Sequence, residues 1–331
     1  MWLEDGTVQV TSGDDGIDAA TDVVTTGGTL SITAGGGASG NRDDGAKGIS
    51  AGVIAVLEGG TVAVDAADDA INTNAYAHLN GATTTLASGD DGIHADQQLV
   101  VSAGTTTVTE AYEGLEAGQI TIAGGDTSLT TSDDGVNVSE PDAEGGAQTL
   151  IITGGTLHVD AEGDGLDVNS GTLEMSGGTV VVDGPTRNDN GALDVDNGMT
   201  ISGGTFLAAG SSGMAMAPSA DSAQASVQFT VSSTIAVGTV LSIVDSSGTV
   251  VATFTTSKQT QSVVYSDAGI VNGQTYTLTS GGSAGTAVLG GLASGGTAGG
   301  TTLTTAVAGE QTSSEMGPGG GGVGGGGGQR P

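Results

Sequence analysis

Residues 6–19 read Gly6-Thr7-Val8-Gln9-Val10-Thr11-Ser12-Gly13-Asp14-Asp15-Gly16-Ile17-Asp18-Ala19, an alternating segment followed by an Asp-Asp-Gly-Ile-Asp motif. The motif recurs in recognisable form at 46–50, 68–72, 90–94, 112–116, 133–137, 163–167, 190–194 and 211–215. Its apolar residue marks the register, at steps of 21 to 32 residues: Ile17, Ile49, Ile71, Ile93, Leu115, Val136, Leu166, Leu193 and Met214. Repeats of this length are typical of solenoids and propellers, and the longer steps carry their excess residues as loops.

Each unit contains short segments in which Thr and Val alternate, a pattern that favours half-buried strands. The unit 163–185 predicts three strands, at Leu166–Val168, Thr172–Met175 and Thr179–Val182, and Gly-Gly pairs between such segments predict turns. Three short strands in one unit predict a rung of a parallel β-helix. We therefore expect an all-β protein with about nine rungs, right-handed because parallel crossovers almost always are.

The predicted domain organisation has three parts. Residues 1–218 carry the β-helix repeats, and residues 219–282 resemble a small antiparallel β module with a hairpin turn at Asp245-Ser246-Ser247-Gly248. A solenoid needs its ends closed, so we expect this module to cap the last open rung. Residues 283–331 are rich in Gly, Ser and Thr, and we predict a disordered tail or linker there.

The composition limits the partners. The chain has 331 residues, with 38 acidic against five basic residues and a net charge of −33, which argues against nucleic acid or an anionic membrane. There is no cysteine and no apolar run long enough to insert into a membrane. The start, Met1-Trp2-Leu3-Glu4-Asp5, does not resemble a signal peptide, so we expect that an N-terminal segment was removed or never captured. We expect a monomer.

Stacking the rungs in register creates chemical columns. The residue before the register mark is nearly always glycine, which predicts a sharp corner with positive φ or a tight backbone approach. The residue two before the mark is acidic in six of nine rungs, and the residue after it is mostly polar. Carboxylates about 4.8 Å apart repel by roughly 3–4 kcal/mol at a protein surface, so the columns predict bound divalent cations. Hard oxygen ligands without cysteine favour Ca²⁺ over other metals.

The predicted ligands of several Ca²⁺ ions are Asp14, Asp15, Asp18, Asp43, Asp44, Asp68, Asp69, Asn72, Asp90, Asp91, Asp96, Glu113, Glu116, Asp133, Asp134, Asn137, Asp164 and Asp167. The strongest cluster is expected over 68–137, with an isolated set at 14–18. The alternative is a solvated acidic face without ions. Lys47 lies in the acidic column and is expected to replace an ion at its rung. The three histidines do not share one column, so we do not expect a transition-metal site.

The ordered motifs at 14–18, 44–49, 90–94, 164–168 and 190–198 resemble a family of bacterial secreted carbohydrate-binding domain proteins. One described member is a clostridial protein that binds cellulose and polygalacturonate. The resemblance covers about residues 1–282. It implies a right-handed parallel β-helix similar to pectate lyases, calcium bound in the turns, and no established catalytic activity.

The resemblance implies a non-catalytic, Ca²⁺-dependent binder of plant cell-wall polysaccharide, mainly acidic pectin or polygalacturonate and also cellulose, located outside the cell or at its surface. Because the chain is strongly acidic, bound Ca²⁺ would have to bridge it to an acidic glycan. A pectate-type polysaccharide lyase is one alternative, with Lys47 or Arg187 as the base beside Ca²⁺. A structural surface or adhesin solenoid is another.

Overall fold

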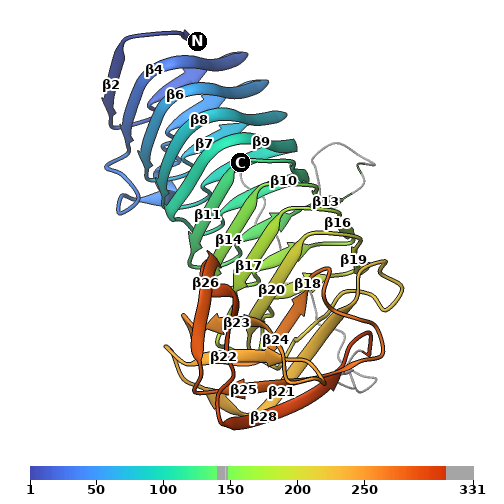
Figure 1. The fold of residues 1–331 in the computed structure, drawn as a ribbon. Helices are drawn as coiled ribbons and strands as arrows, with labels where there is room; N and C mark the ends of the chain where they lie inside the picture. Colours follow the sequence, from blue (N-terminus) through green and yellow to red (C-terminus); the bar gives the residue numbers. More distant parts are fainter. Residues whose placement is uncertain (140–145, 147, 311–331) are drawn as a thin grey trace, which may run out of the picture.

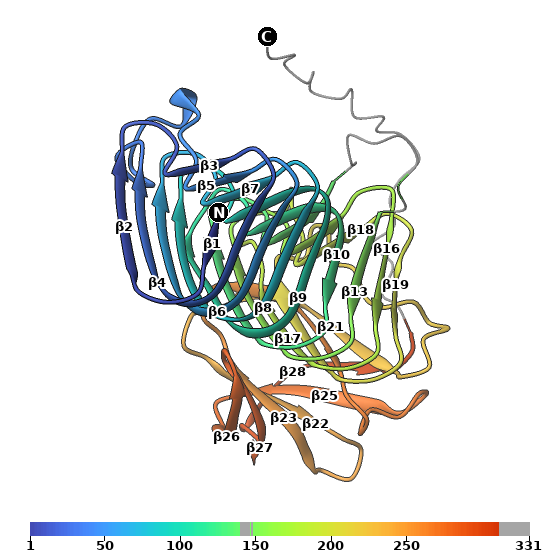
Figure 2. The same cartoon turned by 90° about the horizontal axis from the view of Figure 1, so that it is seen from above.

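The computed structural model describes residues 1–139, 146 and 148–310. The repeats stack into a parallel β-solenoid of about nine turns, which confirms the predicted all-β fold class (Figure 1). Viewed along the stack, successive turns of the chain lie over one another (Figure 2). Within the described residues the one helical element is a short 3-10 helix, η1 (Arg42–Asp44), and no helix is long and apolar enough to cross a membrane.

The solenoid has three faces. The first face contains β3 (Ile17–Ala19), β5 (Ile49–Ala51), β7 (Ile71–Thr73), β12 (Val136–Val138), β15 (Leu166–Val168) and β18 (Leu193–Val195). The second contains β1 (Trp2–Leu3), β13 (Thr149–Ile152), β16 (Thr172–Met175) and β19 (Met199–Ile201). The third contains β2 (Thr7–Ser12), β11 (Asp126–Thr131), β14 (Thr156–Ala161), β17 (Thr179–Asp183) and β20 (Thr205–Gly210). Five long strands turn corners and serve more than one face: β4 (Asp22–Ala34), β6 (Ile54–Ala66), β8 (Tyr76–Ser88), β9 (Ile93–Glu110) and β10 (Leu115–Ile122).

The register column predicted from the motif is the pairing column of the first face. Its residues pair in parallel from Ile17 through Ile49, Ile71, Ile93, Leu115, Val136 and Leu166 to Leu193. The seven residues from Ile49 onward are at most 2 % exposed, and they belong to one apolar core that runs along the solenoid. The ninth copy of the motif does not continue the face, because Met214 lies in no strand.

The glycine column serves close packing. A Cβ atom on Gly48 would lie 2.1 Å from Val64 Cγ1 and 2.5 Å from the carbonyl oxygen of Ala70. The positive φ values occur elsewhere, at the second glycine of the Gly-Gly turns, such as Gly28 (75°) and Gly60 (81°). Of the two predicted reasons for the column, tight backbone approach is therefore the one that the structure shows.

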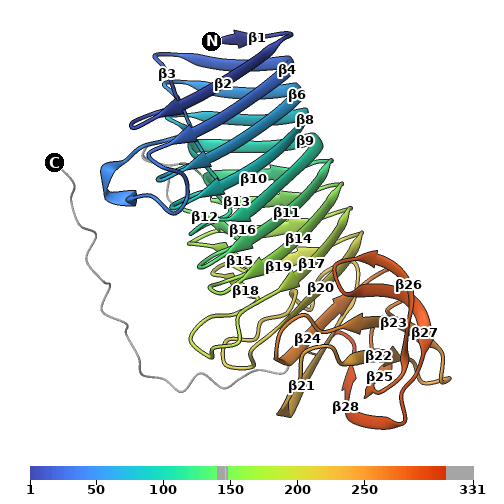
Figure 3. The same cartoon turned by 90° about the vertical axis from the view of Figure 1, so that its left-hand side faces the viewer.

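The C-terminal module joins the solenoid through two antiparallel strands. β24 (Thr260–Ser266) pairs with β20 of the third face on one side and with β21 (Ser226–Ile235) on the other. A separate six-stranded antiparallel sheet contains β22 (Val240–Val244), β23 (Val250–Thr255), β25 (Thr275–Ser280), β26 (Ser283–Leu289), β27 (Leu292–Thr297) and β28 (Thr301–Val307). A second core links the module to Val181 and Leu207 on the outer side of the third face (Figure 3).

The predicted start of a disordered tail at residue 283 is wrong. Three strands follow this point, and the described chain remains in the sheet to Val307. β27 pairs with β23 and β28 pairs with β25, and Leu292, the first residue of β27, is 2 % exposed. Long-range pairing gives these small polar residues the hydrogen bonds that their composition does not reveal. The glycine-rich stretch 311–331 lies outside the described residues.

Candidate functional site

The acidic column lies along the corner where the third face turns into the first. We call this the acidic corner: Asp15, Lys47, Asp69, Asp91, Glu113, Asp134 and Asp164 in the column, with the polar residues that follow the register mark. The main chain between the two faces makes a sharp bend here in each rung. The parallel pairing of the first-face strands brings the column residues of successive rungs next to one another.

Carboxylates of the column bind the backbone of the next rung. The N–H groups of Lys47, Asp91, Asp164 and Gly191 donate to Oδ1 of Asp15 (2.9 Å), Asp69 (3.2 Å), Asp134 (2.6 Å) and Asp164 (2.5 Å), respectively. Each donor stands two residues before its register mark, so the contact repeats along the corner. Part of the reason for acids in register is therefore structural, because these carboxylates satisfy backbone donors at the bend.

The N-terminal half of the corner contains its own cations. Lys47 Nζ contacts Asp68 Oδ2 at 2.6 Å and Asp69 Oδ2 at 2.7 Å, and both acids are nearly fully buried. Burial lowers the pKa of Lys47, but these two carboxylates outweigh it and leave the pKa raised. In the next rung, Arg42 from η1 pairs with Asp90 at 2.9 Å. Lys47 thus occupies the position where the sequence predicted it to replace an ion.

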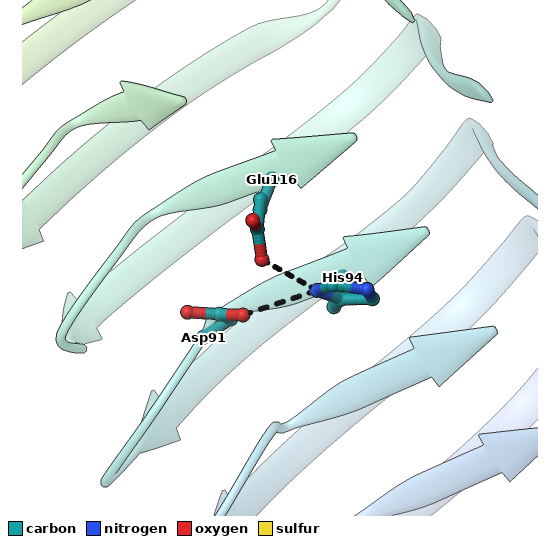
Figure 4. A group of neighbouring side chains, drawn as sticks. All are labelled: Asp91, His94 and Glu116. Carbon is teal, nitrogen blue, oxygen red and sulfur yellow. Dashed lines mark hydrogen bonds and ion pairs between the residues drawn. The ribbon is translucent and has the colours of Figure 1, made fainter. Parts of the chain in front are cut away.

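His94 lies at the centre of a second neutralised cluster (Figure 4). Its Nδ1 atom is 3.2 Å from Asp91 Oδ2 and 2.5 Å from Glu116 Oε2, while its Nε2 atom is 3.2 Å from Asp96 Oδ1. Burial opposes the charge of the imidazole, yet the hydrogen bonds to Asp91 and Glu116 raise the pKa of His94 to about 11. Despite burial, His94 lowers the pKa of Glu116 to about 2. Burial raises the pKa of Asp91 to about 9.

The C-terminal half of the corner has carboxylates without cations. Among the described residues, no basic side chain forms an ion pair with Glu113, Asp134, Asp164, Asp167 or Asp194. Burial, followed by repulsion from neighbouring acids, raises the pKa values of Glu113 to about 8, of Asp134 and Asp167 to about 7, and of Asp164 to about 6. The pKa of Asp194 is raised for the same reasons. These groups have the strongest need for an external cation.

The remaining predicted ligands divide between the corner and its surroundings. Asn72 and Asn137 lie inside the corner, where their amides donate to Asp69 (2.9 Å) and Glu113 (2.8 Å). Asp133 lies one position before the column and is half-buried. Four acids are exposed and are not brought into the dense cluster: Asp14, Asp18, Asp43 and Asp44.

The two candidate bases are poorly placed for catalysis. Lys47 is held between two carboxylates, and its raised pKa keeps it protonated. Arg187 is exposed and pairs with Asp189, its neighbour in the same loop, at 3.3 Å. Neither one therefore presents a free base beside a group of acids.

A groove of about 600 Å³ runs beside the acidic corner, over the ends of third-face strands. It is lined by Ala38, by Glu110, Tyr112, Thr131 and Asp160 near the ends of third-face strands, and by Ser257 and Lys258 of the C-terminal module. Tyr112 is 38 % exposed, and the Arg42 guanidinium carbon lies 4.7 Å from the centre of its ring. Lys258 pairs with Asp160 at 2.6 Å and Glu162 at 3.1 Å. The groove thus combines an aromatic ring with anionic, cationic and hydroxyl groups.

Some of this site was not visible in the sequence. Lys258 reaches the solenoid from 97 residues away, so no local pattern connects it to Asp160 or to the carbonyl of Ala161, to which it donates. Asp194, in contrast, stands in the polar column after its register mark, and this position could have marked it as part of the corner.

The fold and the site define an acidic parallel β-solenoid with a polar groove on one corner. Residues 1–92 match the model of a family described as carbohydrate-binding domain-containing protein, which confirms the resemblance over the N-terminal rungs. This match supports a carbohydrate-binding role for the chain. Neither the comparison with curated proteins nor that with solved structures gave a match.

Proposed function

We propose that the protein is a non-catalytic carbohydrate-binding solenoid, which holds an acidic plant cell-wall polysaccharide of the pectin type in the groove beside Tyr112, with Ca²⁺ on the acidic corner. The observation that carries the proposal is the groove itself, because an exposed aromatic ring is next to several hydrogen-bonding side chains. A sugar presents apolar C–H faces and a rim of hydroxyls, and such a groove offers partners to both. In this proposed role the protein would act outside the cell or at its surface.

The proposed Ca²⁺ dependence rests on charge. The chain carries a net charge of −33, so a polyuronate would be repelled unless cations lie between the two anions. Asp134, Asp164 and Asp167 provide hard oxygen donors that no basic side chain in the described region neutralises. This donor set suits Ca²⁺, and these residues, with Glu113 and Asp194, would hold it. When bound, the ions would supply positive charge toward the carboxylates of the glycan.

The groove is tested by matched tyrosine variants. Tyr112→Ala should weaken binding to soluble polygalacturonate by at least about tenfold, since sugar-facing aromatic area is lost. Tyr76→Ala is the control, because Tyr76 is equally exposed (41 %) but lies in β8 on the second face. Isothermal titration calorimetry measures both. Equal losses in the two variants, or none, would place the glycan elsewhere.

The Ca²⁺ requirement is tested with the same glycan in the presence of a chelator. Binding to polygalacturonate should disappear with the chelator and return when Ca²⁺ is added. Binding that persists in the chelator would contradict the bridging role. Binding restricted to cello-oligosaccharides would show a neutral ligand instead, and no binding to any glycan would favour the structural solenoid.

A further inference from the structure

A second class of metal site lies in the middle of the acidic corner. We propose that Asp91, His94 and Glu116 bind one first-row transition-metal dication, with Zn²⁺ as the representative ion. The site goes beyond the proposed glycan function, because it uses neither the groove nor the C-terminal carboxylates.

The donor atoms already converge. Asp91 and His94 come from one rung and Glu116 from the next, and their ligand atoms lie within 4.8 Å of one another. Both carboxylates approach the same ring nitrogen, at 3.2 and 2.5 Å (Figure 4). In a tetrahedral zinc site with bonds near 2.0–2.2 Å, neighbouring donor atoms are roughly 3.3 Å apart. Small adjustments of the Glu116 side chain would therefore admit an ion, which would replace the proton shared by the three groups.

An outer partner orients the imidazole, and this is an observation independent of the three donors. His94 Nε2 lies 3.2 Å from Asp96 Oδ1 on the opposite edge of the ring. Donation of the Nε2 proton to this carboxylate leaves the lone pair of Nδ1 directed toward Asp91 and Glu116. Histidines that bind metals are held by the same kind of contact, which fixes the tautomer and increases the basicity of the ligand. Asp91 is itself fixed, because its N–H donates to Asp69 and it is 6 % exposed.

The nitrogen donor separates this site from the Ca²⁺ sites. Imidazole suits Zn²⁺ and its neighbours, whereas Ca²⁺ takes oxygen ligands. In the adjoining rungs the position of His94 is occupied by Asn72 on one side and Glu116 on the other, and one rung further by Asn137. The other histidines are placed differently: His78 contacts Ser102, and His158 contacts Asp183. The corner thus offers one mixed nitrogen–oxygen site within a series of oxygen sites.

The test is a calorimetric titration of the whole chain with Zn²⁺ in the presence of saturating Ca²⁺. We expect one saturable Zn²⁺ per chain that Ca²⁺ does not displace. His94→Asn should remove this site, and it should fold, because Asn already occupies the same column in two rungs. His78→Asn is the control and should bind like the wild type. Asp96→Asn should weaken binding by about 10- to 100-fold, as expected for an outer partner.

Two calorimetric results would overturn the proposal. One is the absence of saturable Zn²⁺ binding in the wild-type protein, and the other is unchanged Zn²⁺ binding in His94→Asn. Cu²⁺ serves as a spectroscopic probe of the ligand set. Its electron paramagnetic resonance spectrum should show coupling to one imidazole nitrogen in the wild type and none in His94→Asn. A spectrum without nitrogen coupling in the wild type would assign the ion to carboxylates alone and would also overturn the proposal.

Discussion

The two halves of the acidic corner have the same backbone and differ in how their charge is neutralised. In the N-terminal half, Lys47, Arg42 and His94 each contact buried or half-buried carboxylates. In the C-terminal half, equivalent carboxylates have raised pKa values and no ion pair with a described basic side chain. The same column of carboxylates can thus be neutralised by cationic side chains of the chain itself or be available to bind external cations. An acidic repeat in a sequence therefore indicates a Ca²⁺ site only where no cationic side chain reaches it.

The largest effect is expected from removing an internal cation. Lys47→Met leaves Asp68 and Asp69 buried without a counter-charge, and it should destabilise the fold by about 3 kcal/mol. Urea unfolding measures the change. Arg187→Met is the matched control at an exposed pair and should cost less than about 0.5 kcal/mol. Adding Asp69→Asn to Lys47→Met should recover part of the loss. A cost below about 1 kcal/mol for Lys47→Met would mean that the two halves do not differ in this way.

Calcium should act on the other half. At about 100 times its dissociation constant, a ligand that binds the folded state stabilises it by about 2.7 kcal/mol, so Ca²⁺ should raise the melting temperature. The double variant Asp134→Asn/Asp167→Asn should lose most of this rise. Asp68→Asn should retain it, since Lys47 already occupies its rung. An equal rise in melting temperature with Ca²⁺ in both variants would contradict the expectation that Ca²⁺ binds the C-terminal half of the acidic corner.

The pH dependence has a defined sign. The folded pKa values of Asp134 and Asp167 are about 7, and that of Asp164 is about 6, all above the usual value near 3.9 because of burial and repulsion. The folded state therefore binds more protons, and the stability is present below about pH 4 and is lost as pH rises through about 6–7. In chelator, we expect a loss of about 2 kcal/mol from about pH 5 to about pH 8, measured by urea unfolding. Asp134→Asn/Asp167→Asn should flatten the dependence, and stability that increased with pH would contradict it.

The smallest effect on stability is expected for Arg42, which is more exposed than Lys47. Arg42→Met removes the ion pair with Asp90 and the contact with the Tyr112 ring, both partly exposed. We expect a loss of about 1 kcal/mol in unfolding experiments. A loss as large as that of Lys47→Met would show that exposure does not distinguish the two cations.

The fold could be predicted because the repeat carries its own register. A single apolar residue per motif identified the pairing column from Ile17 to Leu193, since a one-residue slip would turn every buried side chain outward. The C-terminal sheet was only partly predicted. The turn sequence that begins at Asp245 indicated its hairpin, and in the structure the Asp245 carboxylate accepts backbone N–H bonds within that turn. The strands β26 to β28 carry little local sequence signal, because β27 and β28 depend on pairing with distant strands.

The candidate site was predicted as a column and not as a set of contacts. Spacing along the chain placed Asp69, Asp91 and Asp134 together, because parallel rungs repeat each position. It did not show that these carboxylates accept backbone N–H groups, or that Lys258 arrives from the C-terminal module. The grouping of His94 with two acids depends on the directions of side chains from two rungs. The spacing of histidines along the sequence could not predict these directions.

The borders of the groove have a consequence for the length of its ligand. Ala38 belongs to the loop that lengthens the second rung, and Ser257 and Lys258 belong to the C-terminal module, so different parts of the chain mark the two ends. Between them lie the strand ends near Ser88, Glu110, Thr131 and Asp160, which belong to four successive rungs and span about 14 Å at the usual strand spacing. A groove of this length would hold only a short run of the sugar units of the proposed glycan.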